Sequence, residues 1–433
     1  MVRKLEKRWR RRLTTLSACD RVWRYSRLPR SDDPLQGWKI HLSATLLTAN
    51  EVFSRVRPIL VRRDAWFKVA AHLEFLTQLN AGLTEFSQVG KFLTVYPRTT
   101  GEAVELAREL HAATRGLAGP QIPFDARYRK NSLVYYRYGC FRASVKGAAA
   151  PGLITDLTGK SHLDRRAPGC AVPRWLDDPF NKPHSRVDHS QYGGPLAPDY
   201  LPFRAISQRG KGGVYEAVDL SVSPARRVII KEGRRHGETT WDGEDGCERV
   251  KREGRVLRAL RRAGIPVPQV FRELNRAGNH YLVLEKITCR TLISPRKMQP
   301  AKPSWQRALR VLDQLGAVLA RIHETGWVWR DCKPSHIFLR GGAIRLIDFE
   351  GACRIDERRV SPWGSPNYVP VVYRGEFYRR AGTLEDNYAL GVVAFQFMAG
   401  EFPPRHAGRR RVLFQRSGCP DFLRVQIENL LRC

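Results

Sequence analysis

The sequence predicts an α+β protein with two principal domains, and three observations carry this prediction. Short strand-like runs alternate with amphipathic helical segments through residues 1–145. A glycine-rich turn at residues 210–213 lies between two further strand-like runs and opens the second domain, residues 201–433. Two short apolar runs in that domain carry Asp331 and Asp348. Between the domains, residues 146–200 are rich in proline and glycine, which predicts a connector, and their apolar stretches predict that it docks on the first domain.

The chain is strongly basic, with 75 Lys and Arg against 42 Asp and Glu and a formal net charge of +33. An excess of this size is typical of proteins that bind nucleic acid, an anionic surface or an acidic substrate. Because no low-complexity basic tail carries the excess, we do not expect nucleic acid as a partner.

The nine cysteines are scattered and form no Cys-x-x-Cys pair that would indicate a zinc ribbon. Their odd number, and a start that does not read as a secretory signal, predict a protein of the reducing cytoplasm. No run approaches the roughly 20 apolar residues of a membrane helix, so we expect no membrane association.

Residues 38–43 alternate between apolar and polar side chains, which predicts a strand with Lys39 and His41 on the same face. A lysine beside a histidine suits the handling of a phosphate group. A strand whose polar face meets solvent would give the same pattern.

Other strand-like runs of the first domain carry one cation each. The predicted helices at residues 49–61, 71–83 and 101–115 separate these runs. Burial would lower the pKa of a lysine within an apolar run, although a lysine at a sheet edge can also keep its ammonium in water. If the cations converge in one pocket, they form an anion site suited to phosphate or sulfate. The cations concerned are Lys68, Lys91 and Arg137.

The second domain begins with a glycine-rich turn that contains Gly210, Gly212 and Gly213. A buried-strand pattern follows and ends at Lys231. The amphipathic helix after it, residues 247–262, carries Glu253 in a position to pair with that lysine. This order of glycine turn, strand lysine and helix glutamate is typical of the nucleotide-binding part of protein kinases.

The two aspartates complete the kinase pattern. We expect Asp331 to accept the proton of an attacking hydroxyl, and Lys333 to neutralise charge on the transferred phosphoryl group. Asp348 would hold magnesium against the nucleotide phosphates. Glu285, at the end of the strand at residues 281–285, is expected near the edge of the adenine, and an aspartate at the start of the helix at 388–398 is expected to brace the catalytic loop.

Both halves together resemble the lyase and kinase domains of class III lanthipeptide synthetases. The kinase resemblance spans about residues 201–433, and the lyase resemblance spans about residues 23–180. The segments that carry the lyase resemblance are Gly37-Trp-Lys39-Ile-His41-Leu-Ser, Phe67-Lys68, Gly90-Lys91-Phe-Leu-Thr-Val-Tyr-Pro, Tyr135-Tyr-Arg137-Tyr-Gly and residues 172–180.

The resemblance implies a phosphothreonine-lyase-like α+β domain followed by a two-lobed protein-kinase-like domain. It implies that the kinase phosphorylates Ser and Thr of a ribosomal precursor peptide with ATP or GTP and Mg²⁺. The lyase then eliminates the phosphate, which leaves dehydroalanine or dehydrobutyrine. By resemblance Lys68 is the base that removes the α-proton, and His41, protonated at rest, is the acid that protonates the departing phosphate. The implied ligands of the phosphate or carbonyl oxygens are Lys39, Lys91 and Arg137, with Arg127 as a weaker candidate.

Two departures from the family pattern stand out. His336 occupies the catalytic-loop position where kinases ordinarily have asparagine, and we expect its imidazole to serve as a metal ligand or a hydrogen-bond partner. The sequence shows no segment with the cysteine and histidine ligands of a zinc cyclase, so ring closure is expected to need a separate cyclase or to occur spontaneously, if it occurs.

Two other functions fit the same residues. The chain could be a small-molecule or glycan kinase whose first half only binds substrate. It could also be a non-catalytic kinase-like partner of a modification enzyme. Convergence of the first-domain cations in one place would favour the lyase over both.

Overall fold

The computed structural model describes residues 2–18, 21–141, 152–167, 171–180, 194–293, 300, 302–358, 360–370, 373 and 380–432. The chain divides into two compact units. The first contains Met1–Arg226, Lys231–Glu248 and Asn275–His280, and the second contains Arg227–Ile230, Arg249–Leu274 and Tyr281–Cys433. The domain limits expected at residues 145 and 200 do not coincide with the boundaries of these compact units, and they stay a prediction.

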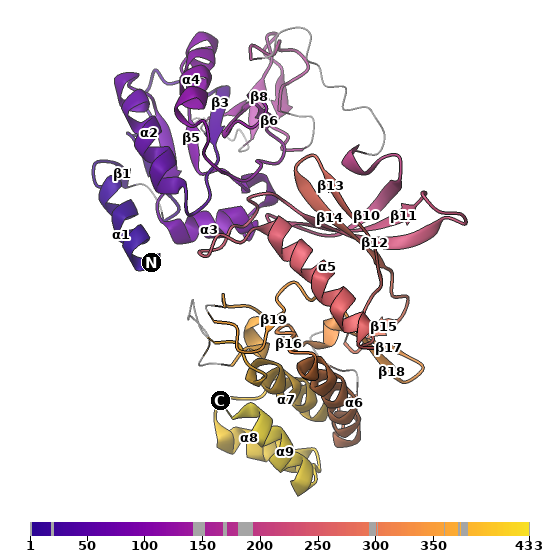
Figure 1. Ribbon diagram of the computed structural model, residues 1–433. Helices are drawn as coiled ribbons and strands as arrows, with labels where there is room; N and C mark the ends of the chain where they lie inside the picture. The colour runs from indigo at the N-terminus through magenta and orange to yellow at the C-terminus, as the bar shows by residue number, and fades with distance from the viewer. Residues whose placement is uncertain are drawn as a thin grey trace. The chain divides into compact units, whose positions relative to one another are not determined.

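A seven-stranded sheet, in the order β1-β2-β4-β5-β3-β7-β6, organises the first unit. Its neighbouring strands pair antiparallel. Helices α2 and α4 lie along it (Figure 1). The strands are β1 (Ser17–Ala18), β2 (Trp23–Tyr25), β3 (Gln36–Leu42), β4 (Phe67–Ala70), β5 (Leu93–Val95), β6 (Ala126–Arg127) and β7 (Val134–Cys140), and the helices are α1 (Val2–Arg12), α2 (Ala49–Arg62), α3 (Leu73–Ala81), the short 3-10 turn η1 (Phe86–Gln88) and α4 (Thr100–Ala113).

The alternation predicted for β3 is confirmed. Trp38, Ile40 and Leu42 are buried on one face of the strand, where they join a core that includes Phe53 of α2 and Leu106 of α4. Burying a large apolar side chain contributes about 1.5–3 kcal/mol, so this face holds the helices against the sheet. The other face is left for the polar positions of the strands.

The described parts of the connector contact both faces of β7. On the apolar face, the Phe180 ring lies 4.1 Å from the Tyr136 ring, and the Tyr136 hydroxyl donates to Asp178 at 2.6 Å. The hairpin of β8 (Leu153–Thr155) and β9 (Ser161–Leu163) leads to Asp164, which contacts Arg137 on the polar face. Residues 142–151, 168–170 and 181–193 of the connector region lie outside the described residues.

Strands β10 (Tyr200–Arg209) and β11 (Gly212–Asp219) form the hairpin that carries the glycine-rich turn, as the sequence predicts. They belong to a five-stranded sheet of order β10-β11-β12-β14-β13. Its other strands are β12 (Arg226–Gly233), β13 (Val270–Arg276) and β14 (Asn279–Glu285).

Helices dominate the second unit. Helix α7 is apolar on nearly all sides, which allows it to be buried within the helical part, against α6 and α9 (Figure 1). The strand pair β17–β18 lies on either side of residues 341–342 and precedes Asp348. The helices are α5 (Gly246–Arg262, whose first turn belongs to the first unit), α6 (Trp305–Glu324), α7 (Leu384–Ala399), α8 (Ala407–Arg416) and α9 (Asp421–Leu431); the strands are β15 (Arg290–Thr291), β16 (Trp327–Val328), β17 (Ile337–Arg340), β18 (Ala343–Leu346) and β19 (Cys353–Arg354).

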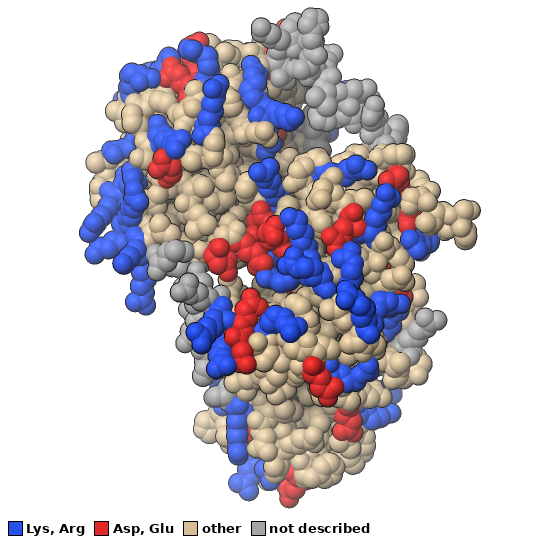
Figure 2. Space-filling model, in the orientation of Figure 1, with Lys and Arg blue, Asp and Glu red and all other residues tan. Residues whose placement is uncertain are grey.

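The mixture of helices and sheets confirms the predicted α+β class. Among the helices that the structure describes, none has the length and hydropathy to span a membrane. Lys and Arg are scattered over the visible surface with Asp and Glu between them (Figure 2).

Candidate active sites

The register of the first sheet places predicted site residues on one face. Lys39 of β3 pairs with Arg137 of β7, and residues directly opposite each other in an antiparallel pair share a face. His41 lies two positions beyond Lys39, and Thr94 of β5 separates it from Lys68 of β4. Two strand spacings are about 10 Å, so Lys68 and His41 stand on the same face with one strand between them.

Arg127 belongs to this face as well, because it pairs with Tyr135, the residue opposite His41. Its guanidinium Nε donates to the Tyr135 hydroxyl at 2.7 Å. Lys91 reaches the same group of residues from the loop ahead of β5. We call this group, Lys39, His41, Lys68, Lys91, Arg127 and Arg137, the cation face.

Asp125 is a member of the site that the sequence did not reveal. One of its carboxylate oxygens lies 2.7 Å from His41 Nδ1, and the other lies 3.5 Å from Lys91 Nζ and 3.9 Å from Arg137 Nε. Its side chain is 1% exposed. Asp125 lies in a loop without periodicity, so the available signal was electrostatic: several buried cations require a buried anion.

Burial changes the proton affinity of the cation face. It lowers the pKa of His41 to about 3, although the neighbouring Asp125 opposes the shift. It also lowers the pKa of Lys39 to about 7 and that of Lys91, since the charged form of each is poorly solvated. Burial therefore favours neutral His41 in the ligand-free protein, and its protonation beside a substrate phosphate stays a prediction.

Lys68 is in a different environment. It is only half-buried, and its ammonium lies 4.3 Å from the centre of the Trp23 ring. A cation over an aromatic face is attracted by the electron density of the ring. Burial lowers the pKa of Lys39 to about 7, although the resemblance assigned Lys39 as a phosphate ligand and Lys68 as the base.

The guanidinium of Arg137 is already engaged. Nη1 donates to Asp164 Oδ2 at 3.3 Å, Nη2 donates to the other oxygen of that carboxylate, and Nη2 also donates to the Arg165 carbonyl at 3.0 Å. Only 2% of Arg137 is exposed. A substrate phosphate would share this guanidinium with the connector.

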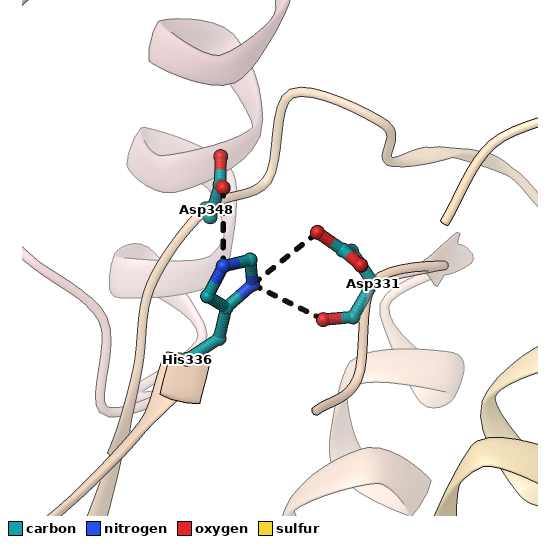
Figure 3. A group of neighbouring side chains, drawn as sticks. All are labelled: Asp331, His336 and Asp348. Atoms are coloured by element: carbon teal, nitrogen blue, oxygen red, sulfur yellow. Dashed lines mark hydrogen bonds and ion pairs between the residues drawn. The ribbon is translucent and has the colours of Figure 1, made fainter. Parts of the chain in front are cut away.

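In the second unit, the catalytic-loop residues converge as the sequence predicts (Figure 3). His336 lies between the two aspartates: its Nδ1 is 3.4 Å from a carboxylate oxygen of Asp331, and its Nε2 is 3.3 Å from one of Asp348. Lys333 Nζ donates to Asp331 at 3.0 Å and to the Ser365 hydroxyl at 2.8 Å. Ser365 in turn donates to the other oxygen of Asp331 at 3.1 Å.

Asp386 braces the catalytic loop, which confirms the prediction for an aspartate at this helix start. It is fully buried at the start of α7 and accepts hydrogen bonds from the backbone N–H groups of Trp329 at 2.8 Å and Arg330 at 2.7 Å. His323 Nε2 lies 2.9 Å from the same carboxylate. Arg330 has a φ of 71°, a left-handed conformation that these contacts hold.

A divalent metal fits the group in Figure 3. Asp331, His336 and Asp348 can each offer one ligand atom, and these atoms lie within 4.8 Å of one another. The two carboxylates suit Mg²⁺, which prefers oxygen ligands. The imidazole nitrogen is a better ligand for transition metals than for Mg²⁺. Glu253, Asp348 and Glu350 form a second group that satisfies the same spacing. Glu253 also accepts a hydrogen bond from the Phe349 backbone at 2.9 Å.

The remaining nucleotide-site candidates are placed less directly. Gly212 has a φ of 152°, and a Cβ there would lie 1.7 Å from the Glu232 carbonyl, so only glycine fits. Lys231 and Glu253 are both buried, but they belong to different units, and their pairing stays a prediction. Glu285 binds Arg345 through both carboxylate oxygens, at 2.8 and 2.7 Å, which lowers its pKa. Its expected place near adenine stays a prediction, as do the nucleotide-binding roles of Gly210 and Gly213.

Comparison with known proteins matches two families along the chain. Residues 2–191 match the family described as "RamC, N-terminal domain", and residues 204–425 match the protein kinase domain. A "Probable SapB synthase" of Streptomyces coelicolor is 32% identical over 391 residues, which cover 86% of this chain and 40% of that protein.

Two kinases each match about half of the chain. The serine/threonine-protein kinase pkn2 of Myxococcus xanthus is 32% identical over 48% of this chain and 26% of its own length. CDPK-related kinase 7 of Arabidopsis thaliana is 28% identical over 53% of this chain and 38% of its own length. The chain thus spans less than half the length of these curated relatives. The protein kinase domain matches half of the chain, so the chain belongs to the protein kinase family, and the RamC N-terminal domain ahead of it supports the resemblance to class III lanthipeptide synthetases.

Proposed function

We propose that this protein dehydrates Ser and Thr residues of a ribosomal precursor peptide in two steps. The kinase domain phosphorylates the hydroxyl with ATP or GTP, and the RamC-like domain eliminates the phosphate. One observation carries the proposal: Lys39, His41 and Lys68 share one sheet face with Lys91 and Arg137, around the buried Asp125. This convergence favours a lyase over a domain that only binds substrate.

In the phosphorylation step, the Asp331 carboxylate accepts the proton of the peptide hydroxyl as the oxygen attacks the γ-phosphorus. Lys333 lies beside it and neutralises charge on the phosphoryl group in transfer. Asp348 and His336 would hold Mg²⁺, which supplies charge neutralisation at the nucleotide phosphates. Ser365 fixes the rotamer of Asp331 through the hydrogen bond to its second oxygen.

In the elimination step, Lys68 removes the α-proton of the phosphorylated residue. The Cα–H electrons form the Cα=Cβ bond, and the Cβ–O bond breaks with loss of phosphate. His41 gives its proton to that leaving oxygen. Lys39 and Lys91 hold the phosphate and stabilise the negative charge that develops.

His41 must gain a proton before it can act as an acid, because burial keeps it neutral in the free protein. The charge of a phosphate dianion nearby would favour the imidazolium. Asp125, 2.7 Å from Nδ1, would stabilise the imidazolium and leave Nε2 to face the substrate.

Lys39 is the second candidate for the base, because its pKa of about 7 leaves much of it neutral. Replacing each lysine with arginine separates the two assignments, since arginine keeps the charge and does not act as a base at neutral pH. We expect Lys68→Arg to abolish elimination from a synthetic phosphopeptide and Lys39→Arg to retain part of it. The reverse result would assign the base to Lys39.

The proposed function is tested by mass spectrometry of a candidate precursor peptide, encoded near the gene, after incubation with protein, nucleotide and Mg²⁺. We expect a gain of phosphate followed by a net loss of water. A peptide that stays unmodified, while a small molecule or glycan is phosphorylated, would support the other kinase function. If a separate cyclase is needed for ring formation, the same peptide should form rings only after that cyclase is added.

A further inference from the structure

The connector carries a carboxylate into the cation face. Asp164 directly follows β9, and its side chain is 3% exposed. Besides the two contacts with the Arg137 guanidinium, it accepts a hydrogen bond from the Cys140 backbone at 3.2 Å. Asp164 therefore belongs to the interior of the first unit, although the sequence places it in a segment that reads as a linker.

The sheet provides the space that this carboxylate needs. A Cβ at Gly139 would lie 2.8 Å from Asp164 Oδ2 and 2.9 Å from Arg137 Nη1. Any larger residue at this position would push the carboxylate or the guanidinium away. The glycine after Tyr138 thus permits the close approach of Asp164 to the strand. A linker that only docked on this domain would not need so close an approach.

The pair also decides where the Arg137 guanidinium points. An arginine fork bound through both Nη atoms has little freedom left, and the Arg165 carbonyl takes a further N–H. Its Nε stays 3.9 Å from Asp125, the carboxylate that contacts His41. Asp164 therefore holds the Arg137 guanidinium in place, and this guanidinium faces the Asp125–His41 pair.

Lys39 is the second residue within reach of this carboxylate, because it stands opposite Arg137 in the register of β3 and β7. Burial lowers the pKa of Lys39 to about 7, and the charge of Asp164 is the foremost influence that raises it. The charged and titratable groups around Lys39 are Arg137 on β7, Lys91 ahead of β5, His41 on its own strand, Asp125 beside His41, and Asp164 and Arg166 on the connector.

We propose that Asp164 is a positioning residue of the lyase site: it fixes the Arg137 guanidinium against the sheet and places a negative charge near Lys39, where phosphate would bind. The role in phosphate binding rests on the function proposed above, whereas the effect on Lys39 does not. The described part of the connector is thus a component of the proposed lyase site.

The test compares two connector variants that each lose one carboxylate. Asp164→Asn removes the charge from the cation face. Asp178→Asn is the matched control, because Asp178 also ties the connector to β7 but does so through the Tyr136 hydroxyl on the opposite face. The titration of Lys39 is followed in the full chain by brief acetylation with acetic anhydride over a range of pH, with mass spectrometry of the Lys39 peptide, since only the neutral amine reacts.

We expect the midpoint of Lys39 acetylation to move to lower pH in Asp164→Asn by about one unit, which is about a tenfold change in the ratio of neutral to charged lysine. In Asp178→Asn the midpoint should stay where it is in the wild-type protein. An unchanged midpoint in Asp164→Asn, or an equal shift in both variants, would overturn the proposal, because the pair would then only attach the connector.

Elimination from a synthetic phosphopeptide gives the second readout. We expect KM in Asp164→Asn to rise three- to tenfold at pH 7.5, where Lys39 has lost its charge, and to approach the unmodified value at pH 6. A KM that falls would mean that Asp164 competes with phosphate for Arg137, which contradicts a positioning role. If the unmodified protein eliminates nothing while the Lys39 midpoint still depends on Asp164, the proposed function fails and the electrostatic assignment survives.

If Asp164→Asn does not unfold cooperatively, Asp164→Glu takes its place. The longer side chain keeps the negative charge but displaces the guanidinium, so we expect a Lys39 midpoint near that of the unmodified protein and a lower kcat for elimination. A kcat equal to that of the unmodified protein would show that the position of Arg137 does not matter and would overturn the proposal.

Discussion

His41 Nδ1 lies 2.7 Å from a carboxylate oxygen of Asp125, and both side chains are buried in the first unit. A carboxylate on one nitrogen of an imidazole fixes its tautomer and stabilises its protonated form. Under the proposed mechanism, the acid of the elimination step depends on a residue that the sequence did not mark.

The first prediction concerns this pair. Replacing Asp125 with asparagine keeps the shape but removes the charge that stabilises the His41 imidazolium. We expect kcat for elimination from a phosphopeptide to fall about 10²- to 10⁴-fold, the range of general acid–base catalysis. Phosphorylation of the precursor should be unaffected, so phosphorylated peptide should accumulate. Rapid dehydration by this variant would show that His41 needs no carboxylate partner.

A second prediction follows from the pKa of His41, which burial lowers to about 3 against an ordinary value of 6.5. Between these two pKa values the unfolded chain binds a proton at this residue that the folded chain does not, so the free energy of unfolding rises with pH across this range. From pH 6.5 to pH 5 the loss of stability due to His41 is on the order of 2 kcal/mol. We expect His41→Gln, which does not titrate, to lose less stability on acidification, measured by urea unfolding at pH 7 and pH 5. Equal losses in both proteins would show that His41 is already solvated in the native state.

Variants of the two sites should give different products from the same peptide. We expect His41→Gln or Lys68→Met to yield phosphorylated peptide, because phosphate is installed and not removed. Asp331→Asn or Asp348→Asn should leave the peptide unmodified, because the first step fails. Mass spectrometry distinguishes these outcomes. The same unmodified product from both classes would contradict the division of work between the two domains.

Metal removal should separate the two steps as well. Among the described residues, the groups spaced to hold a metal lie at Asp331, His336 and Asp348, and at Glu253, Asp348 and Glu350. The cation face relies on lysine and histidine side chains. We therefore expect EDTA to stop phosphorylation while elimination from a synthetic phosphopeptide continues at its former rate. A loss of elimination that Mg²⁺ restores would show that the lyase step also uses a metal.

His336 invites a substitution toward the residue that kinases ordinarily have at this position. In His336→Asn an oxygen donor replaces an imidazole nitrogen, and Mg²⁺ prefers oxygen. We expect the ratio of phosphorylation rates in Mg²⁺ and Mn²⁺ to shift toward Mg²⁺ by about tenfold, the effect of roughly 1.4 kcal/mol in metal affinity. The control is Lys333→Ala, which should lower both rates without changing their ratio. An unchanged ratio in His336→Asn would show that His336 serves as a hydrogen-bond partner of the two aspartates and does not bind the metal.

Local patterns sufficed for much of the fold and for the kinase site. The period-two alternation around Lys39 and His41 predicts a strand because successive side chains of a strand point to opposite faces. Asp331 and Asp348 were found because they lie close to each other along the chain, in the loops that follow β16 and β18, so that their spacing in sequence constrains their spacing in space. The apolar period of α6 likewise predicts its buried face, including Leu312 and Leu315.

The sequence by itself determined the class of the fold, the order of the kinase elements and the strands that carry Lys39, Lys68 and Arg137, since each depends on neighbours along the chain; Lys91, expected on a strand, lies in the loop ahead of β5. Tertiary structure decided the register that brings Lys39, His41 and Lys68 to one face, and it brought Asp125 to His41 and Asp164 to Arg137. It also decided the charge of the site, because the low pKa values of His41 and Lys39 come from burial. Burial and ion pairing depend on residues far apart in sequence, and no local pattern encodes them.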